Sequence, residues 1–398
     1  MIRVLQLKYQ ILVFCPAEYG GIADYAIEQA KALGSLGHRV LILAPPSVTC
    51  ESSGYEHWNL SSLGPKLRRI SRQLRFLRYF FTAATILLQH KDLNRAIAAS
   101  GSQFVLLATY SEYLAPLWAW RLRRWRRQGV RFAAVVHDPV RDFMVGPRWW
   151  HRFSIAQGYS FLDVAFLHAP IQLDTGSPQP QLHTQLIPHG PFRYPAPLTS
   201  ASELRKELAI PPEATLLLSF GHIRNNKNLQ LILKAMVELP QIWLLVAGPE
   251  ATAGQRPASF YRQLAEQLGV NGRCQWQIGY QSPEQVADLF TAADAVLLSY
   301  GSQFRSASGV MNLAAHYRKP VIASAGASAL LDAVGSFGLG VVVQPDNPDA
   351  LVRGIRRFLS EPPAPDWQAY ERANSWQRNA ELVAQALCLD TAAQTTGG

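Results

Sequence analysis

Two basic residues, Arg224 and Lys227, stand three positions apart between an apolar strand and an amphipathic helix. The segment reads FGHIRNNKNLQLILKAM over 220–236, with Gly221 at the end of the strand. Two preorganised cations stabilise a developing anion because they need no rearrangement when the charge forms. We therefore predict an anion site here, with two solvated loop charges as the alternative interpretation.

A glycine pair, Gly20 and Gly21, follows the first apolar strand of the chain, ILVFCP over 11–16. Glycine lacks a Cβ, so its backbone approaches a ligand closely and adopts positive φ angles without strain. The pair is a candidate binding loop, and an ordinary tight turn is the alternative.

His137 stands at the end of another apolar strand, RFAAVVHD over 131–138. Imidazole donates or accepts a hydrogen bond near neutral pH, which suits contact with a sugar hydroxyl or a proton relay. A structural histidine with satisfied hydrogen bonds is the alternative.

Ser308 and Gly309 precede an apolar helix in the segment SYGSQFRSASGVMNLAAHYRKPVIAS, residues 299–324. The first N–H groups of a helix point along its axis and attract phosphate groups. Arg305 would add a cation to such a site.

These residues are positioned by a repeated alternation of apolar strands and helices. Strands are predicted at 11–16, 39–45, 103–109 and 131–138, and again at 215–224, 242–250, 274–280, 295–301 and 320–324. Continuous apolar runs followed by helices are typical of parallel sheets covered on both faces. We predict an α/β protein with two doubly wound Rossmann-like domains, over 1–195 and 196–365, and a helical tail over 366–398.

A length of 398 residues and a hydrophobic fraction of 48% provide for two cores and exclude a disordered chain. Open parallel sheets bind ligands at the carboxyl ends of their strands, so we expect the site in a cleft between the domains. Neither half contains G-x-G-x-x-G, and the loop EYGGIAD has the wrong glycine spacing. A dinucleotide-dependent dehydrogenase is therefore disfavoured.

The order of strand, Gly221, Arg224, Lys227-Asn-Leu, helix and a strand ending in AGPE resembles the donor domain of GT-B glycosyltransferases, specifically the large retaining family 4. The likeness extends to the βαβ unit at 19–43 and to GLGVVVQPDNPDALVRGIRRFL at 338–359. It implies transfer of a sugar, with retention, from a nucleoside-diphosphate sugar to a hydroxyl of a glycan or lipid-linked acceptor. It also implies that neither a metal nor a cofactor takes part.

The resemblance assigns roles to the residues above. Arg224 and Lys227 would clamp the donor diphosphate during catalysis, and His137 would contact the transferred sugar. The donor-binding residues would be Gly20, Gly21, Gly221, Arg224, Lys227, Arg305, Ser308 and Gly309.

The sequence departs from the family at two positions. Most members have two glutamates separated by seven residues, which here fall on Arg305 and Leu313. The first usually positions the sugar and the second usually binds the ribose. A catalytically degenerate protein that binds nucleotide or glycan is therefore the alternative to an enzyme.

The basic residues are concentrated in the first half of the chain. Residues 1–198 contain 22 Lys and Arg against 11 Asp and Glu, which leaves 16 against 17 for 199–398. The stretch from Lys66 to Lys91 is amphipathic, with Arg68, Arg69, Arg72 and Arg75 largely off its apolar stripe, and RLRRWRRQGVR at 121–131 adds six arginines. We expect these arginines to form a membrane or acceptor face toward anionic lipid, with a solvated basic helix as the alternative.

Other classes of partner and location fit less well. A pI of 9.6 suits nucleic acid, but no nucleic-acid-binding module appears, so none is predicted. The four cysteines, Cys15, Cys50, Cys274 and Cys388, form neither a metal motif nor a disulfide framework. No secretory signal is evident. We expect a cytoplasmic protein, with peripheral contact with the inner face of a membrane.

Overall fold

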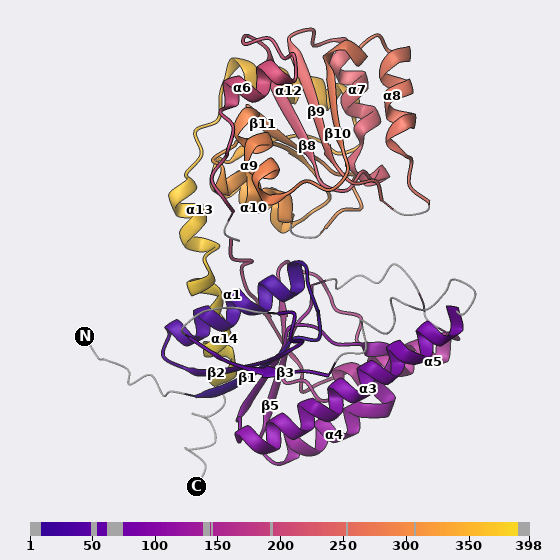
Figure 1. The fold of residues 1–398 in the computed structure, drawn as a ribbon, viewed down its shortest axis with the longest axis vertical. Helices are drawn as coiled ribbons and strands as arrows, with labels where there is room; N and C mark the ends of the chain where they lie inside the picture. Colours follow the sequence, from indigo (N-terminus) through magenta and orange to yellow (C-terminus); the bar gives the residue numbers. More distant parts are fainter. Residues whose placement is uncertain are drawn as a thin grey trace. The chain divides into compact units, whose positions relative to one another are not determined.

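The computed structural model describes residues 9–48, 54–61, 75–137, 144, 146–191, 194–251, 254–305 and 308–388. The chain divides into two compact units. Unit 1 comprises residues 1–190 and 375–398, and unit 2 comprises residues 191–374. Figure 1 shows a sheet flanked by helices in each unit.

Unit 1 is built on a seven-stranded sheet in the order β3-β2-β1-β4-β5-β6-β7, and every neighbouring pair is parallel. The strands are β1 (Gln10–Phe14), β2 (Arg39–Ala44), β3 (Glu56–Asn59), β4 (Phe104–Leu107), β5 (Arg131–Val135), β6 (Val164–Leu167) and β7 (His183–Leu186). The order reverses between β1 and β4, and such a switch point is where an open parallel sheet binds ligands.

Helices cover both faces of this sheet. They are α1 (Gly21–Ser35), α3 (Arg75–Ser100), α4 (Ala115–Arg127), α5 (Arg148–Tyr159) and α14 (Trp376–Cys388), with a 3₁₀ turn, η2, at Glu112–Leu114. Side chains of α3, α4 and α5 share one hydrophobic core with alternate residues of the strands. Helices α1 and α14 pack against each other on the other face (Figure 1).

Unit 2 repeats the plan with a six-stranded parallel sheet in the order β10-β9-β8-β11-β12-β13. The strands are β8 (Thr215–Phe220), β9 (Ile242–Gly248), β10 (Cys274–Ile278), β11 (Ala295–Ser299), β12 (Val321–Ser324) and β13 (Gly340–Val342). Its switch point lies between β8 and β11.

The helices of unit 2 form two further layers. They are α6 (Ala201–Glu207), α7 (Leu229–Val237), α8 (Ala258–Gln267), α9 (Pro283–Ala292), α10 (Gly309–His316), α11 (Ala329–Ser336), α12 (Pro348–Ser360) and α13 (Trp367–Ala373), with 3₁₀ turns η3 (Asn225–Lys227) and η4 (Asn271–Arg273). Leu216 and Leu218 of β8 pack with α9, α10 and α11, whereas Leu217 packs with α7, α8 and α12. Alternate residues of the strand thus enter two separate cores.

The fold class is the predicted one, an α/β protein with two Rossmann-like domains and a helical tail. The boundary between the two units falls after Gly190, whereas we predicted a domain boundary after residue 195. The predicted tail is divided, because α13 packs in unit 2 and α14 returns to unit 1. Three strands have no counterpart among the predicted ones: β6, which is buried, and the edge strands β3 and β7.

Two further observations concern compartment and membranes. Cys15 and Cys274 are buried free thiols, and burial raises their pKa values to about 11 and about 12. Cys50 and the side chain of Cys388 lie outside the described part. Among the helices that the structure describes, none is both long and apolar enough to cross a bilayer.

Candidate active site

The loop after β8 holds the two predicted cations close together. Gly221 adopts a positive φ of 94°, and the Lys227 ammonium turns back to donate a hydrogen bond to the Phe220 carbonyl. A Cβ on Gly221 would lie 3.0 Å from Nζ of Lys227, so glycine serves both the turn and the lysine. Burial, and then the charge of Arg224, lower the pKa of Lys227 to about 8.

The start of helix α10 lies beside this loop. A Cβ on Gly221 would also lie 3.8 Å from Cγ2 of Val310, in the first turn of α10. Ser308, the residue before the helix, does not cap it, because its hydroxyl shares a 3.0 Å hydrogen bond with the Tyr300 hydroxyl. The positive end of the α10 dipole and the two cations thus converge at the switch point of the second sheet.

Asp346 ties three loops of unit 2 together. Its Oδ1 accepts a 3.0 Å hydrogen bond from Nδ2 of Asn228, and its Oδ2 accepts a 2.8 Å bond from the backbone N–H of Ser302. These bonds lower the pKa of the carboxyl, the Ser302 backbone bond most strongly. The Gly301 N–H donates to the Asn226 carbonyl at 3.1 Å, which adds a second link between the loops after β8 and β11.

The predicted glycine pair begins helix α1 in unit 1. Gly20 precedes the helix with a positive φ of 87°, a conformation that favours glycine. Gly21 is the first helical residue, and a Cβ on either glycine would meet no atom within 4 Å. The space above the start of α1 is therefore open to a ligand.

His137 lies in a cluster of aromatic rings around the buried Tyr25 of unit 1. Its ring centroid is 4.8 Å from that of Tyr25 in α1 and 5.6 Å from that of His168. Burial chiefly, with a contribution from His189, lowers the pKa of His137 to about 4. Its Nε2 is buried without a hydrogen-bond partner in the described part of the chain. At neutral pH, His137 is an uncharged hydrogen-bonding group.

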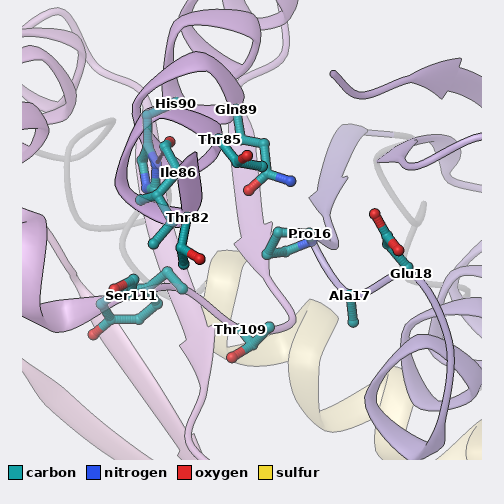
Figure 2. Close-up of a pocket in the computed structure, with 11 residues that line it drawn as sticks. Pro16, Ala17, Glu18, Thr82, Thr85, Ile86, Gln89, His90, Thr109 and Ser111 are labelled. Atoms are coloured by element: carbon teal, nitrogen blue, oxygen red, sulfur yellow. Dashed lines mark hydrogen bonds between the residues drawn. The ribbon is translucent and has the colours of Figure 1, made fainter. Parts of the chain in front are cut away.

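A cavity of about 430 Å³ opens at the switch point of the first sheet (Figure 2). Its lining comes from the ends of β1 and β4 and from helix α3. The lining residues are Pro16, Ala17, Glu18, Thr82, Thr85, Ile86, Gln89, His90, Thr109, Tyr110 and Ser111. Its volume falls within the range of roughly 300–1,000 Å³ that is usual for small-molecule sites.

Several predicted residues are less closely tied to these sites. Arg305 is exposed in the loop between β11 and α10. Leu313, at the position of the second family glutamate, is buried in the core at 7% exposure. Arg68, Arg69 and Arg72 lie outside the described residues, and Arg75 is the first residue of α3.

Sequence reasoning missed several residues that the fold brings to these sites. The pKa of His222 is lowered by burial and by Arg224 and Lys227, so His222 lies near both cations. Its place directly after Gly221 is the signal that would have identified it. Asp346 and Tyr300 have no such local signal, because the order of strands in the sheet is what brings them near the loop after β8.

The chain has two Rossmann-like units, and in unit 2 the loop with Gly221 and the two cations lies beside a helix N-terminus. This architecture is the GT-B fold. Residues 200–383 match the family model described as Glycosyl transferases group 1. That segment, which spans most of unit 2 and continues into α14, is similar to this family.

A curated relative is the D-inositol 3-phosphate glycosyltransferase of Streptomyces griseus, which is 28% identical over 250 residues. The match covers 58% of this chain and 47% of the relative, so the chain spans about half the length of that protein.

Solved structures resemble the chain over nearly its whole length. Sucrose-phosphate synthase from Thermosynechococcus elongatus has a TM-score of 0.59 at 19% identity and covers 98% of both chains. HepE from Anabaena, in complex with UDP and glucose, has a TM-score of 0.59 at 15% identity and covers 98% of this chain and 100% of its own. At such identities the likeness shows the fold alone.

Proposed function

We propose that this protein transfers a sugar, with retention and without a metal, from a nucleoside-diphosphate sugar to a hydroxyl of a glycan or lipid-linked acceptor. The observation that carries the proposal is the convergence of Arg224, Lys227 and the N-terminus of α10 at one switch point. The family of residues 200–383 supports the reaction class. The UDP in the HepE structure makes UDP the first nucleotide to test.

The chemistry asks the protein to stabilise a leaving group. The diphosphate gains negative charge as the glycosidic bond breaks, and preorganised cations stabilise that charge more than they stabilise the bound donor. Arg224, Lys227 and the N–H groups at the start of α10 would supply this stabilisation. His137 would hydrogen-bond the transferred sugar as a neutral imidazole.

Retention by double displacement needs a carboxylate nucleophile beside the anomeric carbon. We nominate none, since the family glutamate positions are occupied by Arg305 and Leu313. We propose departure and attack on the same face, with the leaving phosphate receiving the acceptor proton. Product stereochemistry followed by NMR tests this step, and an inverted anomer would contradict it.

A thermal-shift panel with UDP, GDP, ADP, CDP and dTDP tests donor binding. Ligand at 100 times its dissociation constant stabilises a fold by about 2.7 kcal/mol, so the matching nucleotide should give a clear shift. The shift should disappear in the Arg224→Ala, Lys227→Ala double variant. It should persist in Arg353→Ala, which removes an exposed arginine from α12 in the same unit.

Turnover separates the enzyme from the degenerate alternative. Arg224→Ala should cost about 2–4 kcal/mol of transition-state stabilisation, because one preorganised charge is lost. We expect kcat/KM to fall by the corresponding factor. Donor binding without transfer to any acceptor in the wild type would favour a nucleotide-binding protein. Activity lost with EDTA and restored with magnesium would contradict the metal-independent mechanism.

We also propose that unit 1 contacts an anionic membrane through helices α4 and α5. One face of α4 carries exposed apolar and basic side chains at helical spacing: Leu117, Trp120, Arg121 and Arg124. Leu117 and Trp120 are 49% and 47% exposed. On α5, Trp149 and Phe153 are exposed beside Arg148 and Arg152. Aromatic and arginine side chains together suit the lipid headgroup layer.

Co-sedimentation with phosphatidylserine vesicles tests this surface. Replacing Trp120 and Trp149 by Ser, or Arg121 and Arg124 by Glu, should weaken pelleting, at about 1 kcal/mol for each basic residue near the surface. Only the arginine contribution should be sensitive to salt. Equal pelleting of all variants would refute the membrane face, while Arg353→Glu on unit 2 serves as the matched charge control.

A further inference from the structure

Helix α10 begins without the cap that its sequence could provide. Ser308 precedes the helix, and serine is among the residues that most often accept a hydrogen bond from the first helical turn. Its backbone is extended, with φ −109° and ψ 116°, as in a capping residue. Its side chain nevertheless accepts no capping bond from residues 309–316, all of which the structure describes. In the same unit, Ser200 and Ser282 do cap α6 and α9, each through a 3.3 Å bond from the third helical residue.

Tyr300 holds the Ser308 hydroxyl instead. The two hydroxyl groups share a buried hydrogen bond of 3.0 Å. Tyr300 follows strand β11, and its ring stacks on Phe304 with the centroids 4.0 Å apart and the planes 12° from parallel. Its backbone N–H donates to the Ser324 carbonyl, and the Ser324 hydroxyl donates to the Tyr300 carbonyl, both at 2.9 Å. Separate contacts thus fix the ring and the backbone, so Ser308 has a well-positioned partner.

The uncapped start of α10 leaves backbone donors available to a ligand. Among the described residues, the N–H groups of Gly309 and Val310 have no hydrogen-bond partner. Gly309 is exposed, and a Cβ there would meet no atom within 4 Å. Burial raises the pKa of Tyr300, while the Ser308 bond and the charge of Arg224 oppose this rise, so Arg224 lies near the tyrosine. The free donors, the tyrosine and a cation therefore lie at one place.

We propose that Tyr300 is a positioning residue of the donor site, which holds the Ser308 hydroxyl so that the first N–H groups of α10 stay free for a phosphate of the donor. The inference rests on the proposed glycosyltransferase function and adds a residue that acts through Ser308 rather than on the donor. A serine hydroxyl without its tyrosine partner would rotate about χ1 and accept a hydrogen bond from the second or third N–H of the helix. It would then compete with the phosphate for the same donors.

Tyr300→Phe tests this role, because phenylalanine keeps the ring beside Phe304 and removes only the hydroxyl. The titrant is the nucleoside diphosphate that stabilises the wild type in the thermal-shift panel, with UDP as the first probe. Calorimetry on the full chain should show about tenfold weaker binding, the effect of losing one good hydrogen bond. The midpoint of urea denaturation should not fall, because the new cap compensates for the lost hydroxyl pair. A merely structural tyrosine would lower stability as well as affinity.

Removal of the serine hydroxyl should reverse the effect on binding. In the Tyr300→Phe background, Ser308→Ala leaves no hydroxyl to cap the helix, so the double variant should recover most of the lost affinity. The same substitution should lower the urea midpoint of that background, because the new cap is lost. Tyr317→Phe is the matched control, since the Tyr317 hydroxyl donates to the Pro195 carbonyl at 3.1 Å at the other end of α10. This variant should bind the nucleotide like the wild type.

Three outcomes would overturn the proposal. They are wild-type affinity in Tyr300→Phe, a double variant that binds no more tightly than Tyr300→Phe, and a Ser308→Ala substitution that costs no stability in that background. The stability comparison needs no nucleotide. A wild-type chain that binds no nucleotide of the panel refutes the proposed donor site and this inference with it. Nucleotide binding that does not depend on the Tyr300 hydroxyl refutes this inference alone.

Discussion

Lys227 is a partly buried cation whose charge depends on what binds beside it. Its pKa of about 8 in the free protein reflects burial and the neighbouring Arg224. A bound diphosphate favours the protonated form and therefore raises this pKa. By linkage, binding above pH 8 must take up a proton, whereas binding well below pH 8 does not.

We therefore predict that the affinity for the matching nucleoside diphosphate falls as the pH rises above about 8. The decline approaches tenfold per pH unit until the pH reaches the pKa of the bound state. Calorimetry in buffers of different ionisation enthalpy measures the proton uptake directly.

Lys227→Arg provides the matched control for this titration. Arginine keeps its charge throughout this range, so the variant should bind without this pH dependence. A wild-type affinity that is constant between pH 7 and pH 10 would contradict the role of Lys227 in the site.

The ends of strands β8 and β9 approach each other closely at two glycines. Gly248, the last residue of β9, has a φ of 134°, and a Cβ there would lie 2.5 Å from the Gly221 carbonyl oxygen. The end of β9 thus fixes the path of the loop that carries Arg224 and Lys227. This close approach explains why the AGPE motif has a glycine at position 248.

Gly248→Ala should destabilise unit 2 by about 1–3 kcal/mol and weaken nucleotide binding. Alanine is strained at this φ angle, and its Cβ would collide with the Gly221 backbone. Gly335→Ala is the control, since Gly335 is exposed in α11 and a Cβ would meet nothing within 4 Å. There the same substitution should stabilise by about 0.5–1 kcal/mol. Urea denaturation measures both, and equal effects would contradict the close approach at Gly248.

At the scale of the whole molecule, the chain returns to unit 1 to complete it. Asn379 of α14 is fully buried, and its Nδ2 donates to the Tyr25 hydroxyl at 2.8 Å and to the Pro188 carbonyl at 2.7 Å. Its Oδ1 accepts from Gln29 of α1 at 2.9 Å. Residues far apart in sequence thus share one buried hydrogen-bond network.

Asn379→Ala should destabilise unit 1 by about 2–4 kcal/mol, because it leaves buried donors and acceptors unpaired and creates a small cavity. Arg378→Ala, on the exposed side of the same helix, should change stability by less than about 0.5 kcal/mol. Chemical denaturation followed by circular dichroism compares the two. Similar losses in both variants would argue against the network.

Most central strands could be predicted because strands buried on both faces need continuous apolar runs, whereas the four-residue strand β6 (VAFL) is too short to give this signal. Strands β1, β8 and β9 are buried on both faces, and their Leu, Val and Ile runs carry that signal. The edge strands β3 (EHWN) and β7 (HTQL) are largely exposed and polar. Their pairing with β2 and β6 comes from the fold, which no local pattern records.

Local sequence patterns predict the two α/β domains and the order of strand, glycine and cations around Gly221, Arg224 and Lys227. These features are local, because apolar runs and turn residues act over short distances along the chain. Three features come from the tertiary structure alone: the contact of α10 with Gly221, the hydrogen bonds of Asp346 to two other loops, and the cavity where α3 meets two strand ends. Strand order sets these contacts, and strand order depends on long-range packing between segments that are distant in sequence.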